Sequence, residues 1–334
     1  MACCSCFSGL AKQQCHPSAS CRSVHRAGRM KVLIAGATGM VGKSLVKALL
    51  DRGDEVFAVG RSRAKIVEVF GQGVTAESYE SLSTELLQSL DAVVNLAGAS
   101  IGASGAWTPE VKKLILDSRV LTTSRLSEAL LDAGAKARFL SASAIGIYGE
   151  QDLHDETSKD EDTAIPGSSP DFFLGEVCHQ WEAAAANLPA EQVVLLRTGI
   201  VLCKGEGALG QMELPFKMGV GGRMGSGEQF MSWISLEDEV RAILFCIDSP
   251  NIFGPINLVA GTARQIDFAE CLAAAMHRPC LLPTPGFLLR LALGSNLAQE
   301  LVLASQRIHS RRLPEAGFVF EDTNLAETLA KVYR

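Results

Sequence analysis

The chain has 334 residues, of which 47% are hydrophobic and 20% charged, and its formal net charge at pH 7 is −6. This composition supplies enough apolar material for one large α/β domain with a smaller one beside it, and it is unlike that of disordered chains. An acidic balance offers no basic surface for nucleic acid. No uncharged apolar run reaches the roughly 18 residues that a membrane-spanning helix needs.

The first 29 residues differ from the rest of the chain in charge. They hold four basic residues, no acidic residue and five of the ten cysteines. Without them, 27 basic residues stand against 37 acidic ones, so the net charge of the remainder is −10. A basic, Ser-rich, acid-free leader is typical of an organellar transit peptide. Zinc binding is a weaker alternative because Cys3-x-x-Cys6 has no second ligand pair at a zinc-site spacing, and a secretory signal would need an apolar segment.

The stretch KVLIAGATGMVG at 31–42 is the strongest functional signal. The apolar run Val32–Ile34 leads into glycines at positions 36, 39 and 42, and a helix-periodic segment follows. A strand, a glycine turn and a helix in this order place backbone N–H groups and the positive end of a helix against a pyrophosphate. The stretch therefore predicts a dinucleotide site.

The next predicted strand, Glu55–Val59, is followed by the segment Gly60-Arg61-Ser62-Arg63. In a dinucleotide fold an acidic residue here binds the ribose 2′-OH of NAD, whereas an arginine accommodates the 2′-phosphate of NADP. The two arginines favour NADP, and the alternative is that they are solvated surface residues. A further strand pattern, Asp91–Gly98, ends in small residues that let a flat cofactor approach the backbone or let a helix pack closely on the sheet.

Strands and helices continue to alternate along the chain. In order we expect a helix from Thr108-Pro109 to about Asp132, a strand at Arg138–Ala142, a polar surface loop at 150–170, a helix at Asp171–Asn187 capped by Asp171, a strand at Gln192–Thr198, a capped helix near Ser235–Asp248 and a last core strand at Ile256–Val259. This alternation predicts an α/β fold, a Rossmann-type doubly wound parallel sheet with a small C-terminal, mostly helical domain. We divide the chain into the transit peptide (1–29), an NADP-binding domain (30–262) and a C-terminal domain (263–334).

Several motifs resemble the extended short-chain dehydrogenase/reductase superfamily, namely Thr38-Gly39-x-x-Gly42, Asn95-x-Ala97-Gly98 and Ser143…Tyr148-Gly149. More narrowly, the chain resembles the atypical "epimerase family" group of bacteria, mitochondria and plastids. The blocks that carry this resemblance include SASAIGIYG at 141–149, RTGIVL at 197–202 and MSWI at 231–234. The resemblance implies a Rossmann fold that binds NADP(H), followed by a C-terminal domain of this length.

The motifs and the resemblance together give a set of expected cofactor-binding residues, and no metal site is expected. The cofactor set is Gly36, Thr38, Gly39, Met40, Val41, Gly42, Arg61, Ser62, Leu96, Ala97, Gly98 and Arg197.

The usual catalytic motif of the superfamily is absent. Ordinary members use Tyr-x-x-x-Lys, in which the tyrosine moves a proton and the lysine lowers its pKa and holds the ribose. None of the three tyrosines here has a lysine four residues later, and the segment Phe172–Cys178 contains neither residue type. We expect Ser143 and Tyr148 as the catalytic candidates. A hydroxyl that caps a turn is the alternative for Ser143, a pocket wall is the alternative for Tyr148, and Cys178 is expected to be core.

Arg119 lies on the long predicted helix at 108–132. A guanidinium near the site would suit bidentate binding of an anionic substrate. The alternative is an ordinary surface ion pair with a nearby carboxylate.

Two functional hypotheses follow. One is an NADP(H)-dependent oxidoreductase or nucleotide-sugar epimerase-like enzyme with atypical catalytic residues and an unknown small-molecule substrate. The other is a non-catalytic NADP(H)-binding regulatory or scaffold protein of an organelle, since relatives of this group include one associated with plastid division. The leader favours a plastid over a mitochondrion. A homodimer stays open, and so does a peripheral membrane contact through the amphipathic stretch Leu288–Leu303, for which core packing is the alternative.

Overall fold

A computed structural model describes residues 28–102, 107–169 and 172–334. Residues 1–27 of the expected transit peptide, with its zinc-ligand alternative, lie outside the described residues. So does Asp171, the expected helix cap.

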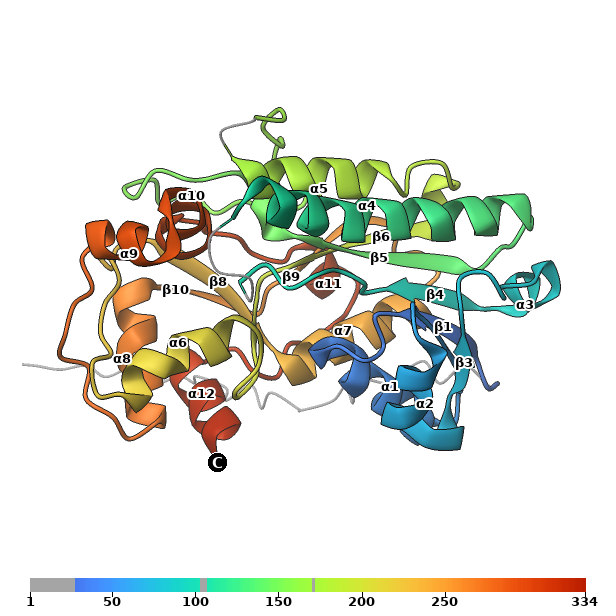
Figure 1. Cartoon of the computed structure of the whole chain (residues 1–334), viewed down its shortest axis with the longest axis horizontal. Helices are drawn as coiled ribbons and strands as arrows, with labels where there is room; N and C mark the ends of the chain where they lie inside the picture. The colour runs from blue at the N-terminus through green and yellow to red at the C-terminus, as the bar shows by residue number, and fades with distance from the viewer. Residues whose placement is uncertain (1–27, 103–106, 170–171) are drawn as a thin grey trace, which may run out of the picture.

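The main sheet contains seven parallel strands in the order β3-β2-β1-β4-β5-β6-β9 (Figure 1). They are β1 (Lys31–Ala35), β2 (Glu55–Val59), β3 (Thr75–Glu77), β4 (Ala92–Asn95), β5 (Arg138–Ala144), β6 (Val193–Thr198) and β9 (Gly254–Leu258). The strand order reverses between β1 and β4, and doubly wound sheets bind ligands at such a point, outside the carboxyl ends of the strands. The expected Rossmann-type sheet is confirmed.

Helices cover both faces of this sheet because its strands are apolar on both sides. One face packs against α1 (Met40–Arg52), α2 (Arg63–Phe70) and α7 (Leu236–Asp248). The other face packs against α3 (Thr84–Ser89), α4 (Pro109–Asp132) and the residues that follow α5. Helix α5 (Phe173–Ala183) lies beside α4 in Figure 1. Three short helices, η1 (Gly71–Gly73), η2 (Ile145–Tyr148) and η3 (Ala190–Gln192), complete this part.

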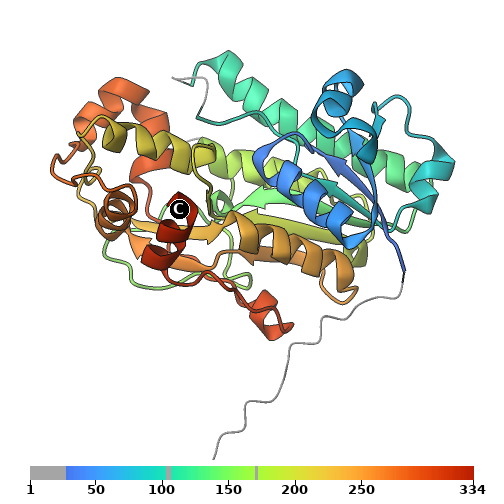
Figure 2. The same cartoon turned by 90° about the horizontal axis from the view of Figure 1, so that it is seen from below.

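A second, three-stranded sheet lies at the other end of the molecule (Figure 2). It joins β7 (Ile200–Leu202), β8 (Phe230–Ser235) and β10 (Gly261–Arg264) in the order β10-β8-β7. Around it and beyond it lie α6 (Gly207–Lys217), α8 (Gln265–Ala275), α9 (Gly286–Leu293), α10 (Ser295–Leu297), η4 (Ala298–Leu303), α11 (Arg312–Glu315) and α12 (Leu325–Tyr333). In this small sheet, β7 and β8 precede residue 262, whereas β10 extends past it. The division of the chain into domains at 30–262 and 263–334 therefore stays a prediction.

Several element ends follow from capping chemistry that the sequence contains. Thr108 accepts a hydrogen bond from the N–H of Val111 at the start of α4, with Pro109 as its first residue, and Ser235 caps α7 in the same way. The stretch 288–303 is less regular than expected. It breaks at Gly294 into α9 and a second helical segment made of α10 and η4, and Leu291 on α9 is exposed. Within the described ranges, no helix combines the length and apolar character needed to cross a membrane.

Candidate functional site

The glycine turn between β1 and α1 is shaped by close backbone contacts. Gly36 has φ 78°, and a Cβ built on it would lie 2.6 Å from the carbonyl carbon of Leu96. A Cβ on Gly42 would lie 2.3 Å from the carbonyl oxygen of Gly36, so both positions require glycine. Gly39 is exposed and precedes the first residue of α1, Met40. Because the first N–H groups of a helix have no partner inside it, this turn presents donors to an anion.

Other expected cofactor residues follow the carboxyl ends of β2 and β4, the strands on either side of β1. Arg61 and Ser62 follow β2, and Ser62 accepts a hydrogen bond from the N–H of Lys65 as the cap of α2. Leu96 follows β4, and its N–H donates to the carbonyl of Ala35 over 2.9 Å. We call this group the cofactor edge, and it consists of Gly36, Thr38–Gly42, Arg61, Ser62 and Leu96–Gly98. Arg61 and Gly98 are exposed there.

Arg197 is a buried residue of the main sheet. It lies on β6 opposite Ser143 of β5, is 2% exposed, and its guanidinium forms a bidentate ion pair with Glu182 of α5, with both N···O distances at 2.9 Å. The Ser143 hydroxyl donates to the same carboxylate over 2.7 Å. Burial by itself would lower the pKa of Arg197, but the Glu182 carboxylate and the Tyr148 hydroxyl raise it above its usual value. Each charge is therefore compensated inside the fold.

Tyr148 extends this buried network across the sheet. Its side chain is fully buried, its hydroxyl accepts from Arg197 over 2.9 Å, and the hydroxyl donates to the side-chain oxygen of Asn257 on β9 over 2.9 Å. Burial raises the pKa of the phenol above its ordinary value. The structure thus brings Ser143, Tyr148 and Arg197 together in one internal cluster.

Helix α5 contains neither a tyrosine nor a lysine. Its first turns contain Leu174 and Cys178, and Cys178 is 3% exposed. Burial raises the pKa of this thiol to about 12, so it is neutral at physiological pH and resembles core rather than a nucleophile. The helix start is held by Glu300, whose carboxylate accepts the N–H groups of Phe173 and Leu174 over 3.1 and 2.7 Å.

A cavity of about 340 Å³ lies beside this helix start. Its walls come from η2, the loop after it, α5 and the segment 295–303, and they include Ile147, Phe172, His179 and Glu300. Its volume suits a small molecule. Among the described residues, no cluster of three or more His, Cys, Asp or Glu side chains is placed to hold a metal ion.

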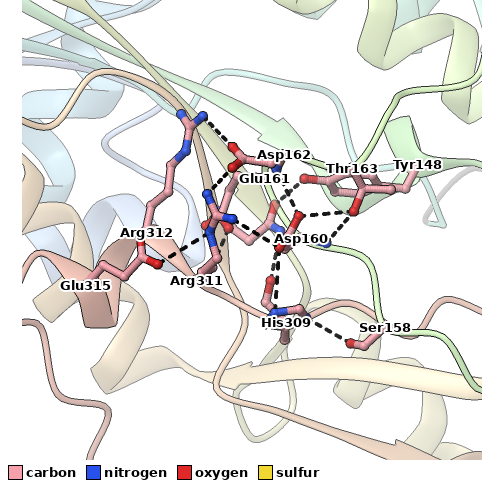
Figure 3. Close-up of polar contacts among 11 residues, drawn as sticks. Tyr148, Ser158, Asp160, Glu161, Asp162, Thr163, His309, Arg311, Arg312 and Glu315 are labelled. Carbon is pink, nitrogen blue, oxygen red and sulfur yellow. Dashed lines mark hydrogen bonds and ion pairs between the residues drawn. The ribbon is translucent and has the colours of Figure 1, made fainter.

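The polar loop at 150–163 is linked to the chain at 305–312 by two β-bridges and by side-chain hydrogen bonds and ion pairs (Figure 3). Asp162 pairs with Arg311 and with Arg312, the latter over 2.9 Å. His309 contacts the Ser158 hydroxyl through Nδ1 over 2.9 Å, but its Nε2 is 4.0 Å from Asp160, too far for a hydrogen bond. These side chains form a structural tie rather than a nucleophile–base arrangement.

Sequence reasoning did not connect Glu182 or Asn257 with the candidate residues. A signal was present, because Arg197 is a charge inside the apolar strand VVLLRT and Asn257 a polar residue inside the strand GPINL. A buried charge needs a buried partner. Glu182 was the nearest carboxylate in the preceding helix.

The strand order, the glycine turn and the small residues after β4 define the fold of an extended short-chain dehydrogenase/reductase. The chain belongs to the NAD dependent epimerase/dehydratase family, whose model matches residues 32–197, and a domain of unknown function, DUF1731, matches residues 284–332. The resemblance to the epimerase family group is therefore confirmed.

Relatives of this chain occur in bacteria, plants and mammals. An epimerase family protein of Mycobacterium leprae is 38% identical over 305 residues, which cover 90% of this chain and 94% of that protein. A chloroplastic SDR39U1 homologue of Arabidopsis thaliana is 35% identical, covering 93% of this chain and 88% of its own. The crystal structure of human SDR39U1 with NADPH is similar, with a TM-score of 0.79, 31% identity and coverage of 91% and 99% of the two chains.

Proposed function

We propose that this chain binds NADP(H) and acts as an oxidoreductase or epimerase-like enzyme on a small molecule. The observation that carries the proposal is the glycine turn Gly36–Gly42, which leaves the start of α1 open at the point where the strand order reverses. The human relative crystallised with NADPH supports the same cofactor.

The residues present fit this cofactor. The turn Gly36–Gly42 would hold the pyrophosphate, Arg61 and Ser62 would hold the 2′-phosphate, and Leu96–Gly98 would lie against the ribose and nicotinamide. NADP(H), when bound, supplies hydride transfer. The residues of the cofactor edge would hold it at the carboxyl ends of β1 and β4.

Ser143 and Tyr148 stay the catalytic candidates, and Arg197 a candidate for cofactor contact. Ser143 donates to Glu182 and Tyr148 to Asn257, so each hydroxyl must give up an internal partner before it can donate to a substrate. Ser143 has the better position to move a proton, because a carboxylate already accepts its hydrogen bond over 2.7 Å.

The cofactor half is tested at Arg61. Arg61→Ala should weaken NADPH binding about ten- to hundredfold, because a charge-assisted contact to the 2′-phosphate is lost, and should leave NADH binding unchanged. Isothermal titration with both cofactors measures this. Lys65→Ala removes an equal exposed charge from the first turns of α2 and serves as the control. Equal loss for NADPH and NADH would overturn the assignment to NADP.

The catalytic half is tested by turnover. NADPH oxidation with a panel of carbonyl compounds and nucleotide sugars should find at least one substrate, with loss in Ser143→Ala. Tight NADPH binding with no turnover on any substrate would instead support the non-catalytic regulatory or scaffold protein.

We further propose an organellar location, a plastid. The acid-free composition of residues 1–29 and the chloroplastic relative of Arabidopsis support it. A fluorescent fusion of the full chain should enter plastids in plant cells, and a fusion that starts at Met30 should stay outside them. Import of the shortened fusion would contradict the proposal.

A further inference from the structure

The cavity of about 340 Å³ beside the start of α5 has an apolar wall that two glycines shape. A Cβ built on Gly175 would lie 2.6 Å from the ring of Phe172. One built on Gly149, where φ is 72°, would lie 3.2 Å from the ring of Pro166. The glycines therefore let both rings pack close to the backbone, and both rings line the cavity. None of its described lining residues belongs to the cofactor edge.

The polar part of the wall includes two carboxylates and an imidazole. Glu300 is 8% exposed, and its two oxygens accept N–H groups from the start of α5. Glu150 is exposed and accepts one hydrogen bond, from the Gln299 amide over 2.7 Å. The imidazole of His179 has no hydrogen bond or ion pair with any described residue. Because a carboxylate can accept about four hydrogen bonds, these groups have acceptor capacity to spare.

The wall carries these carboxylates but, among its described residues, neither lysine nor arginine. Lys112 acts on Glu300 from outside the wall, and its ammonium lies over the Phe173 ring, 4.9 Å from the ring centre. Burial raises the pKa of Glu300 and the nearby Glu150 charge adds to this, whereas the bound N–H groups and Lys112 oppose it. The wall thus has a net negative charge, which attracts a cation and repels an anion.

We infer that this cavity binds a small organic cation, an amine or a guanidine attached to an apolar body. The positive group would lie beside Glu150 and Glu300, and the apolar body would lie against Ile147, Pro166 and Phe172. An ammonium has three N–H donors and a guanidinium five, which suits a wall rich in acceptors. A phosphate or carboxylate group would meet two like charges there. The inference goes beyond the proposed function, since binding of the cation needs no cofactor.

The test uses benzylamine as the probe, with benzyl alcohol and benzoate as neutral and anionic molecules of nearly the same size. Each is titrated into the unaltered protein without cofactor and followed by NMR. We expect benzylamine to bind about tenfold more tightly than either of the others, because only its ammonium makes a charge-assisted contact with a carboxylate. The ring resonances of His179, assigned by comparison with His179→Gln, should shift with benzylamine and so locate the probe in this cavity.

A second measurement removes one charge from the wall. Glu150→Gln keeps the size of the side chain and an acceptor for Gln299, so it should weaken benzylamine binding about fivefold and leave benzyl alcohol unchanged. Glu176→Gln is the matched control, because Glu176 lies on α5, also accepts a glutamine amide, that of Gln180, and does not line the cavity.

Three results would each overturn the inference: equal affinity for benzylamine and benzoate, unshifted His179 resonances, or an unchanged benzylamine affinity in Glu150→Gln. If Glu150→Gln does not fold, the order of the three affinities and the His179 resonances of the unaltered protein decide. Because no cofactor is added, failure of the protein to bind NADPH would count against the proposed function and leave this test intact.

Discussion

At the scale of single residues, the side chains around the site separate into those that share one buried polar network and those that have no carboxylate partner. Ser143, Tyr148 and Arg197 all belong to the first group, joined through Glu182 and Asn257. Arg61 and Arg119 have no carboxylate partner among the described ion pairs. The first group holds the sheet and its covering helix together.

Tyr148→Phe tests the structural side of this distinction. The change removes one hydroxyl and leaves the Asn257 oxygen and one Arg197 N–H without their partner in a buried place. We expect the free energy of unfolding to fall by about 1–3 kcal/mol, as measured by urea denaturation. An unchanged unfolding free energy together with lost turnover would assign the hydroxyl to catalysis instead.

The sequence was sufficient to predict the positions of Arg61 and the glycines, because these positions depend on local chain geometry. It was not sufficient for Ser143 and Tyr148, whose partners lie 39 and 109 residues away. The partner of a buried side chain depends on how helices settle on the sheet, and periodicity does not specify that.

At the scale of elements, the glycine turn brings the first turn of α1 close against the backbone that follows β1. Most strands and helices of the main sheet could be predicted because alternation and caps such as Thr108 and Ser235 are local signals. The small sheet could not, because β7 and β10 have three and four residues and are paired only through β8. Short strands of this kind have no periodicity of their own.

Gly42→Ala tests the contact between the turn and the helix. The added methyl group would meet the Gly36 carbonyl at 2.3 Å, so α1 must move away from β1. We expect NADPH binding to be lost and thermal stability to fall, in a thermal melt with and without NADPH. Gly73→Ala is the control, because its methyl group would meet only Leu50 at an ordinary 3.7 Å. Equal NADPH binding by both variants would show that the turn tolerates a side chain.

At the scale of the whole molecule, one buried carboxyl links global stability to pH. Glu239 on α7 is 2% exposed, one of its oxygens accepts from Thr198 over 3.0 Å, and the other has no partner within the described structure. Burial raises its pKa to about 8 from an ordinary value of 4.5. The folded state therefore holds a proton that the unfolded chain releases.

This raised pKa sets the sign of the pH dependence. The contribution of Glu239 to stability is fully present below pH 4.5 and is lost as the pH rises toward about 8, since only the unfolded chain becomes deprotonated in this window. Glu239→Gln should flatten the fall of the unfolding free energy between pH 5 and pH 8, measured by urea denaturation at several pH values. Glu237→Gln, on the exposed side of the same helix, should leave the fall unchanged. An identical slope in Glu239→Gln would contradict the expectation.

The tie between the loop at 150–163 and the chain at 305–312 also has a consequence for the order of folding during synthesis. Glu161 accepts the N–H of Arg311, a residue made 150 positions later, whereas all parts of the cofactor edge lie between residues 36 and 98. Chains fold from the N-terminus as they leave the ribosome. The cofactor edge can therefore form early, whereas the contacts of the loop at 150–163 with the chain at 305–312 can form only after almost the entire chain has been made. A chain that ended before residue 305 would contain the whole glycine turn but would lack these partners of the loop at 150–163.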